Sequence, residues 1–284
     1  MSSAPHTTVD LHTFLCRLRE APAVLVSVHE ARGSVPRGVG AWMAVFDREV
    51  VGTIGGGHLE WDAMRRAREL LARRAVEAVV QSVTLGPSLG QCCGGAVTLG
   101  YEPVDARHSP ALERRLAAVR TPVALFGGGH VGRAIAQALA PLPFALNWID
   151  SRDEVFPDPL PFGVQAEHSA PVQAAVADLA AGSHVLVMSF SHAEDLDIVA
   201  ACLDRVRTRD DLGFIGLIGS RTKWATFRHR LGDRGFDEAS LARVTCPIGL
   251  PGITGKEPAV IAAAVAAQLL LVESGAPAGS SMPA

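Results

Sequence analysis

The sequence has few aromatic residues, no excess of positive charge and no apolar run long enough to cross a bilayer. Tyrosine occurs once and aromatic residues make up 5% of the 284 positions, while alanine and glycine are frequent, which suggests closely packed helices. The net charge of −3 gives no reason to expect a nucleic-acid partner. The longest apolar stretch, residues 259–272, is interrupted by Gln268, so we expect no membrane contact. The N-terminus lacks a basic region followed by an apolar core, so we expect no signal peptide and a cytoplasmic protein.

The cysteines are odd in number, irregularly spaced and free of any C-x-x-C pair. They are Cys16, Cys92, Cys93, Cys202 and Cys246. This spacing argues against a disulfide framework and favours reduced thiols in the cytosol. It also makes a zinc site or a dithiol redox centre at the adjacent pair Cys92-Cys93 a weak interpretation.

Length and composition predict two globular domains. A chain of 284 residues is long enough for both, and about half of it is apolar. Several apolar runs between residues 23 and 85 predict strands, and a charged, polar segment after residue 103 marks the expected joint. We therefore predict an α/β protein with an N-terminal α/β domain over residues 1–105, a linker over 106–121, a Rossmann-like parallel-sheet domain over 122–272 and a flexible tail over 273–284.

Residues 122–150 organise the second domain. An apolar run leads into Gly127, Gly129 and Gly132, which fit G-x-G-x-x-G, and a helix with one apolar face follows. The first glycine allows a tight turn, the second lets a ligand approach the backbone, and the third lets helix and strand pack closely. The next apolar run ends at Asp150, where an acid that binds a ribose would lie. The helix starts inside this glycine turn, and its N-terminus suits any phosphate, of which nicotinamide cofactors are only the commonest case.

Polar residues follow the other expected strands of this sheet, whose carboxyl ends form the usual ligand-binding edge. Arg152 could hold a ligand phosphate or pair with its neighbours. His192 would lie at this edge, and Asp195 could either line it or cap the next helix. Ser220 and Arg221 suit an anion, although helix capping by Ser220 explains that serine without a ligand.

The first half contains three glycine-rich loops with candidate site residues. Arg37 lies in one of them and could hold an anion or be a solvated turn residue. Glu60 follows a second glycine turn in the first turn of a helix, where a carboxylate suits the dipole without any chemistry. Cys93 precedes Gly94 and Gly95, whose amides could stabilise a thiolate, and an inert loop cysteine is the alternative.

Eight short motifs occur together in one order along the chain. They are Gly33-Ser34-Val35-Pro36-Arg37, Gly52–Glu60, Cys93-Gly94-Gly95, Phe126–His130, Ile149–Arg152, Ser191-His192, Gly216–Arg221 and Pro247–Leu250. In this register they resemble the XdhC/CoxI family, and the resemblance runs from about Ala23 to Val272. It implies an N-terminal α/β domain followed by a Rossmann-like domain. Two departures are the doubled Cys92-Cys93 and the helix start at Gly255–Pro258.

The resemblance implies a carrier of the molybdenum cofactor (molybdopterin) rather than an enzyme. Such a protein holds the cofactor while a cysteine desulfurase supplies its sulfido ligand, and then inserts it into xanthine dehydrogenase. The implied partners are the molybdenum-binding subunit of the dehydrogenase, the desulfurase, the molybdenum cofactor cytidylyltransferase and a second copy of the chain. Cys93, with Cys92 as the second candidate, would approach the molybdenum. The implied cofactor-binding residues are Arg37, Glu60, Cys93, Gly94, Gly95, Gly127, Gly129, His130, Gly132, Asp150, Arg152, His192, Ser220 and Arg221.

Two other functions stay open from the residues themselves. The glycine fingerprint and Asp150 favour an NAD(P)-dependent oxidoreductase, but no Tyr-x-x-x-Lys or similar proton-relay pair accompanies His192 and Asp195. A nucleotide-sensing module would need only the phosphate-binding turn. It would bind adenine nucleotides and no pterin.

Overall fold

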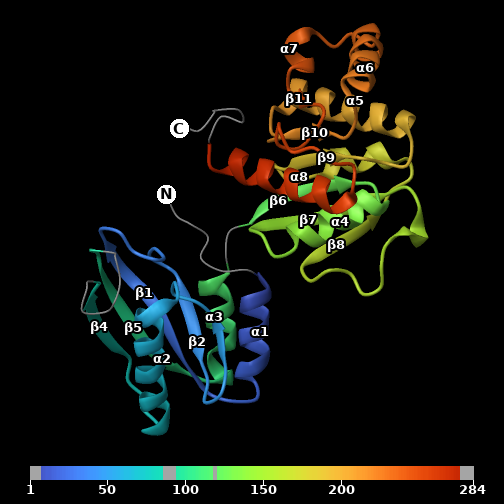
Figure 1. The fold of residues 1–284 in the computed structure, drawn as a ribbon. Coiled ribbons are helices and arrows are strands. Elements are labelled where there is room, and N and C mark those ends of the chain that lie inside the picture. Colours follow the sequence, from blue (N-terminus) through green and yellow to red (C-terminus); the bar gives the residue numbers. More distant parts are fainter. Residues whose placement is uncertain (1–7, 86–93, 118–119, 276–284) are drawn as a thin grey trace. The chain divides into compact units, whose positions relative to one another are not determined.

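The computed structural model describes residues 8–85, 94–117 and 120–275, in two compact units (Figure 1). The first unit spans residues 1–119 and the second spans residues 120–284. Most of the segment suggested as a linker is folded within the first unit, as η2 (Ala106–His108) and α3 (Ser109–Leu116). Leu112 of α3 is buried in the same apolar cluster as Phe14 and Leu18. The apolar spacing of α3 therefore buries it against the first unit.

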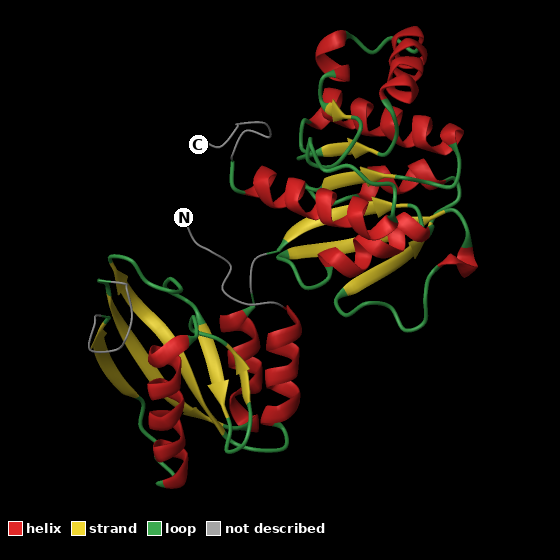
Figure 2. Cartoon of the chain, viewed as in Figure 1, coloured by secondary structure: helices red, strands yellow, loops and turns green. Residues whose placement is uncertain are grey.

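The first unit contains an antiparallel five-stranded sheet in the order β3-β2-β1-β5-β4 (Figure 2). Its strands are β1 (Ala23–Arg32), β2 (Trp42–Val45), β3 (Val50–Gly52), β4 (Val79–Thr84) and β5 (Ala96–Val104). Successive side chains of a strand point to opposite faces, so an apolar run such as the first half of β1 supplies both faces with core residues.

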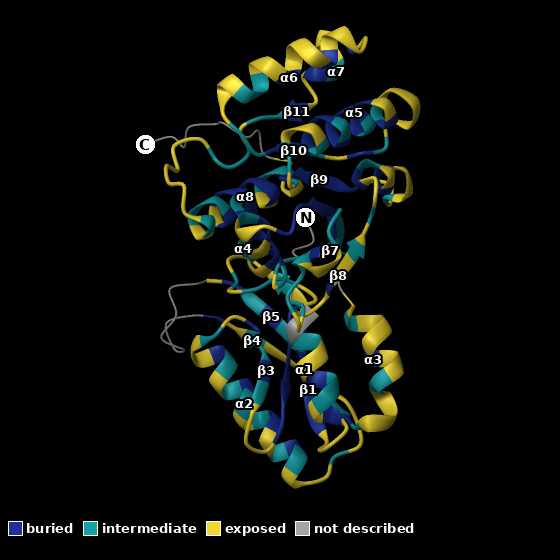
Figure 3. Cartoon of the chain, turned by 90° about the vertical axis from the view of Figure 1, so that its right-hand side faces the viewer, coloured by how far each residue is buried: buried dark blue, intermediate teal, exposed yellow. Residues whose placement is uncertain are grey.

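Helices cover both faces of this sheet. On one face, α1 (Thr8–Leu18) and α3 pack on Leu25 and Trp42. On the other face, α2 (Gly57–Ala72) packs on Val24 and Val26. Figure 3 shows the outer side of α3 as exposed, and the first half of β1 is buried.

The second unit is built on a parallel six-stranded sheet in the order β11-β10-β9-β6-β7-β8. Its strands are β6 (Thr121–Phe126), β7 (Phe144–Asp150), β8 (Val164–His168), β9 (His184–Val187), β10 (Ile215–Leu217) and β11 (Val244–Thr245). Numbered from β6 as the first strand, this is the 3-2-1-4-5-6 order of the Rossmann fold, with its switch point between β6 and β9. The predicted α/β fold class with a Rossmann-like second domain is confirmed.

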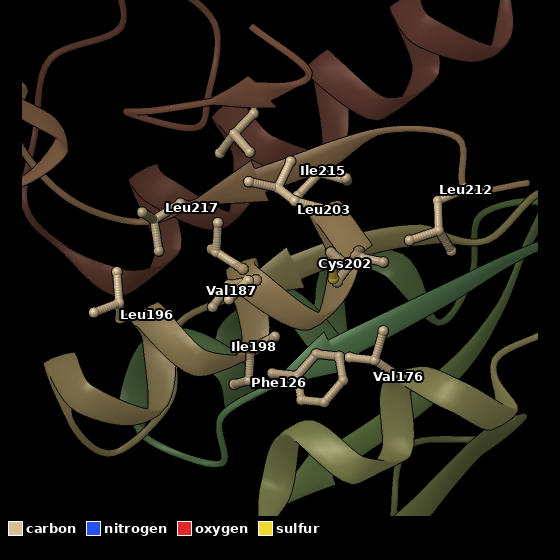
Figure 4. Close-up of a cluster of buried hydrophobic side chains, with 14 of the residues drawn as sticks. Phe126, Val176, Val187, Leu196, Ile198, Cys202, Leu203, Leu212, Ile215 and Leu217 are labelled. Carbon is tan, nitrogen blue, oxygen red and sulfur yellow. The ribbon is translucent and has the colours of Figure 1, made fainter. Parts of the chain in front are cut away.

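Helices pack on each face of the parallel sheet. α4 (His130–Leu139) and α8 (Pro258–Glu273) share an apolar cluster on one face. The other face carries η4 (Val172–Asp178), α5 (His192–Arg209), α6 (Arg221–Asp233) and α7 (Glu238–Leu241). Figure 4 shows part of this second cluster, where Cys202 lies among Phe126, Val187 and Leu203. Burial raises the pKa of the Cys202 thiol to about 12, so this cysteine is an inert core residue.

The last helix is fastened to the sheet by polar contacts as well as apolar ones. Glu273 at the end of α8 accepts hydrogen bonds from Thr121 Oγ1 at 2.6 Å and from His184 Nε2 at 2.8 Å. The other ring nitrogen of His184 accepts the amide N–H of Phe214, which fixes the tautomer that donates to Glu273. Among the helices that the structure describes, α8 included, there is none with the length and apolarity to cross a membrane.

Candidate functional site

The glycine turn of the second unit joins β6 to α4. Gly132 is buried in the first turn of α4, and a Cβ there would lie 1.9 Å from the carbonyl oxygen of Gly127. That carbonyl accepts a hydrogen bond from the indole N–H of Trp148 at 2.9 Å. The third glycine of the motif is therefore required by the close packing of helix and turn, as the fingerprint predicts.

Gly129 has a different role in the same turn. It is the N-cap residue of α4, no side chain in the described part of the chain caps this helix end, and Gly129 and His130 are both exposed. A Cβ at Gly129 would meet no atom within 4 Å. The space above this glycine is open, and the first amides of α4 are not covered by a capping side chain. The arrangement suits an anion such as a phosphate, because the helix dipole adds to the amide donors.

Asp150 at the end of β7 has hydrogen-bond donors on both carboxylate oxygens. Arg152 donates from Nε to Oδ1 and from Nη2 to Oδ2, each at 2.9 Å. The amide of Gly128 donates to Oδ2 at 2.6 Å, and the amide of Arg152 donates to Oδ1 at 2.9 Å. Burial alone would raise the pKa of Asp150, but these hydrogen bonds outweigh it and hold the pKa below its usual value. The carboxylate is therefore an ionised clamp on the glycine turn.

The pairing of Asp150 with Arg152 engages the two residues expected to bind a ribose or a phosphate. Of the two interpretations open for Arg152, pairing with a neighbour is the one that the structure shows. A ribose diol would have to displace the guanidinium of Arg152 to reach Asp150. The geometry therefore gives little support to the ribose contact that the spacing of Asp150 suggests.

The segment after β9 contains an exposed aromatic residue beside this pair. Phe190 follows β9, and the guanidinium carbon of Arg152 lies 4.5 Å from its ring centroid. Close by, Ser151 donates a hydrogen bond to Glu194 Oε1 at 2.7 Å and so links the end of β7 to the start of α5. The sequence patterns predict no role for Phe190, although a large apolar residue soon after a parallel strand is a signal for one.

The remaining predicted residues of the second unit lie at the ends of β9 and β10. His192 is exposed in the first turn of α5, with its ring 6.4 Å from that of Phe227. Ser220 caps α6 by accepting the amide N–H of Lys223 at 3.1 Å, and Arg221 is exposed beside it. The capping interpretation of Ser220 is therefore correct. The cap of α5 is Ser191, and not Asp195 as one sequence interpretation suggests.

A buried ion pair at this edge escaped sequence reasoning. Lys223 Nζ lies 2.6 Å from Asp195 Oδ2 and 2.8 Å from the carbonyl oxygen of Ile218. The other oxygen of Asp195 accepts the amide and the hydroxyl of Ser189. Asp195 therefore joins the ends of β9 and β10 and does not cap a helix.

The glycine loops of the first unit meet one another. A Cβ at Gly95 would lie 2.4 Å from the carbonyl oxygen of Ser34, and one at Gly55 would lie 2.3 Å from Pro36 Cβ. The loop around Ser34 and Pro36 thus contacts both other glycine loops. The structure brings the predicted residues Arg37, Glu60, Gly94 and Gly95 to one end of this unit.

Glu60 organises the second of these loops. Its Oε2 accepts the amides of Ile54 at 2.9 Å and Gly56 at 3.1 Å, and also the hydroxyl of Thr53. Arg37 reaches the same loop through the carbonyl oxygen of Thr53, at 3.5 Å. In this structure Glu60 acts as a staple between α2 and the turn before it. That contact is more specific than the dipole effect expected from its place in the helix.

The two cysteines predicted to approach a metal, Cys92 and Cys93, lie outside the described residues. Gly94, which follows them, is exposed, and a Cβ there would meet no atom within 4 Å. Cys246 at the end of β11 is partly buried, and burial raises its pKa to about 11. Across residues 8–85, 94–117 and 120–275, no group of three or more His, Cys, Asp or Glu side chains could hold a metal ion.

Comparisons with known proteins identify both parts of the chain. A family model for the XdhC Rossmann domain matches residues 123–269, and one for the XdhC and CoxI family matches residues 16–81. The Escherichia coli (strain K12) protein called "Uncharacterized protein YqeB" is 27% identical over 96% of this chain, which spans only 48% of that relative. A crystal structure described as a xanthine dehydrogenase from Bacillus halodurans has a TM-score of 0.74 at 19% identity, covering 96% of this chain and 98% of that one. This likeness shows a shared fold.

Proposed function

The chain belongs to the XdhC and CoxI family, and from this premise we propose that it is an accessory protein that binds the molybdenum cofactor, holds it for sulfuration and delivers it to xanthine dehydrogenase. The cofactor is then cargo, and the protein has no catalytic turnover of its own.

The observation that carries this proposal is the open end of α4. Molybdopterin ends in a phosphate, and the turn at Gly129 offers an uncapped helix N-terminus with free space above the backbone. Gly127 and Gly132 allow the turn to pack closely against its neighbouring backbone. The residues present thus fit a phosphate-bearing ligand.

The loops of the first unit support a role at the metal end of the cargo. Arg37 and Glu60 contact the turn before α2, and Gly95, two residues after Cys93 in the sequence, packs on the backbone of Ser34. A thiolate there would be a soft ligand of the kind that molybdenum accepts. We propose Cys93 for this contact, with Cys92 as the second candidate.

The occupied carboxylate of Asp150 counts against an NAD(P)-dependent oxidoreductase. Both of its oxygens already accept hydrogen bonds from Arg152, so the usual acceptor of the ribose diol is engaged.

The proposed partners are the molybdenum-binding subunit of xanthine dehydrogenase, a cysteine desulfurase, the molybdenum cofactor cytidylyltransferase and a second copy of the chain, all in the cytoplasm.

The test is the molybdenum and oxidised-pterin content of the protein purified without oxygen from cells that make the cofactor. We expect near-stoichiometric pterin in the wild type, and less molybdenum or sulfide in Cys93→Ala. Cys202→Ala is unsuitable as a control because that thiol fills the core, so Cys16→Ser on the partly exposed side of α1 serves instead. A wild-type protein that carries no pterin, even with free cofactor in excess, would refute the carrier function. Binding of NADH by that protein would favour the oxidoreductase.

A further inference from the structure

Phe190 presents a large aromatic ring to solvent at the ligand-binding edge of the parallel sheet. It is 67% exposed, although it lies only three residues after Val187, the last residue of the buried strand β9. One side of its ring is approached by the guanidinium of Arg152 at 4.5 Å. Planar guanidinium groups stack on aromatic faces, and the pair exposes both an aromatic and a planar cationic surface.

Arg152 is held rigidly in this position. Its two hydrogen bonds to Asp150 are bidentate, and the Asp150 side chain is only 1% exposed while that of Arg152 is 39% exposed. A buried carboxylate thus fixes the guanidinium plane from one side and leaves the remainder accessible. A ligand that stacks here would order few additional side-chain rotamers, which favours binding.

The pair is connected directly to the glycine turn. The carboxylate that holds Arg152 also accepts the amide of Gly128, at 2.6 Å. Gly128 immediately precedes the open position Gly129. Arg152 and Phe190 are thus linked through one carboxylate to the turn at which the phosphate is proposed to bind.

The charges around Arg152 favour one kind of ligand group over another. The positive charge of Arg152 is paired with Asp150, and Glu194 acts on the same guanidinium electrostatically. A second anion, such as the 2′-phosphate of NADP, would meet a cation that is already neutralised. A neutral planar heterocycle gains from stacking and needs no free charge.

We propose that Arg152 and Phe190 form a stacking platform for the planar ring system of the phosphate-bearing ligand held at the Gly127–Gly132 turn. This rests on the proposed function, in which that ring system is the pterin. Phe190 is then a binding residue, and Asp150 is a positioning residue that acts through Arg152.

The test compares Phe190→Leu, Phe190→Trp and the wild type for binding of 6-hydroxymethylpterin monophosphate, followed by pterin fluorescence, and of inorganic phosphate by competition. Phe190 is exposed, so these variants should fold. We expect Phe190→Leu to weaken phosphopterin binding at least about fivefold and to leave phosphate competition unchanged. Phe190→Trp, which keeps an aromatic ring, should bind phosphopterin as the wild type does. Phe162→Leu, at another exposed phenylalanine of the same unit, should bind as the wild type does.

Equal phosphopterin binding by Phe190→Leu and the wild type would overturn the platform. If Phe190→Leu and the wild type both still carried molybdenum cofactor from the cell, the proposed function would stand without the stacking platform. A wild type that binds neither phosphopterin nor cellular cofactor would overturn both proposals. Weaker binding by Phe162→Leu and Phe190→Leu alike would also count against a specific role for Phe190.

Discussion

The ammonium group of Lys223 and the carboxylate of Asp195 form an ion pair at the ligand-binding edge of the parallel sheet, where their side chains are only 11% and 3% exposed. The pair connects α5, which follows β9, to α6, which follows β10. Since each charge has further partners in Ser189 and Ile218, both ions are well satisfied. Such a pair is costly to break from one side, because the remaining charge stays buried.

Lys223→Met should therefore destabilise the protein strongly. Removal of one partner from a buried pair costs about 3–5 kcal/mol of unfolding free energy. Lys223→Met combined with Asp195→Asn should recover part of this loss, because no unpaired charge remains. Urea unfolding of the two single variants and the double variant measures the coupling. Additive losses would show that the two groups do not interact.

Two glycines of the turn should respond in opposite ways to alanine. Gly132→Ala forces a Cβ towards the Gly127 carbonyl and should cost about 1–3 kcal/mol of stability. Gly129→Ala places its methyl group in open space and should leave stability nearly unchanged. It should weaken binding of the proposed cofactor by roughly tenfold, or ~1.4 kcal/mol, because the methyl group occupies the ligand's approach. Thermal unfolding and cofactor content distinguish the two effects. Unchanged cofactor content in Gly129→Ala would place the ligand elsewhere.

Asp150→Asn should show a stability loss that depends on pH. The pKa of Asp150 is lower in the folded chain than in the unfolded chain, where it is about 3.9. The ionised carboxylate therefore stabilises the fold above about pH 4, and this contribution is lost as the pH falls through the folded-state pKa. We expect Asp150→Asn to cost roughly 2 kcal/mol at pH 7 and progressively less below pH 4.

The control for this prediction is Asp153→Asn in the same loop. Asp153 pairs with His168, but its side chain is 73% exposed, so its removal should change stability by less than about 0.5 kcal/mol. Denaturant unfolding at pH 7 and pH 3 provides the measurement. A loss of the same size for Asp150→Asn at both pH values would contradict the role of its charge.

Glu60→Gln tests the staple in the first unit. One oxygen of Glu60 accepts three donors from the turn before α2, and charged acceptors contribute about 1.5–3 kcal/mol. The amide oxygen of Glu60→Gln should keep part of this stabilisation, whereas Glu60→Ala should lose most of it. Glu69→Gln removes the charge of a half-exposed partner of Arg65 and Arg66 in the same helix and should cost below about 0.5 kcal/mol. Hydrogen exchange at the amides of Ile54 and Gly56 would locate the effect. Unaltered protection in Glu60→Ala would exclude the staple.

Patterns along the chain predict the parallel sheet and the glycine turn well, because the fingerprint is local. Gly127, Gly129 and Gly132 stand in one turn, and their separate roles follow from the backbone alone. The pairing of Asp150 with Arg152 could be stated from sequence as an alternative, since the two residues lie next to one strand end. No local pattern could choose between that pairing and a ligand.

Contacts between separate strands were beyond the reach of such patterns. The ion pair of Lys223 with Asp195 depends on β9 and β10 being neighbours in the sheet, and the contact of Phe190 with Arg152 depends on β9 and β7 flanking β6. The contact of Gly95 with Ser34 depends in the same way on the pairing of β1 with β5. In α3, the apolar spacing predicts a helix but not the unit against which it packs.

At the switch point of the second unit, the two central strands end so close together that no side chain fits between them. A Cβ at Gly127 would lie 2.0 Å from the carbonyl oxygen of Met188, and the amide of Met188 donates to the carbonyl oxygen of Phe126. This surface is main chain, whose chemistry substitution does not alter. The side chains beside this main-chain surface belong to the segments that follow the strands, among them residues 151–156 after β7 and 188–194 after β9. Substitutions in such segments would alter the choice of ligand while the turn itself stays the same.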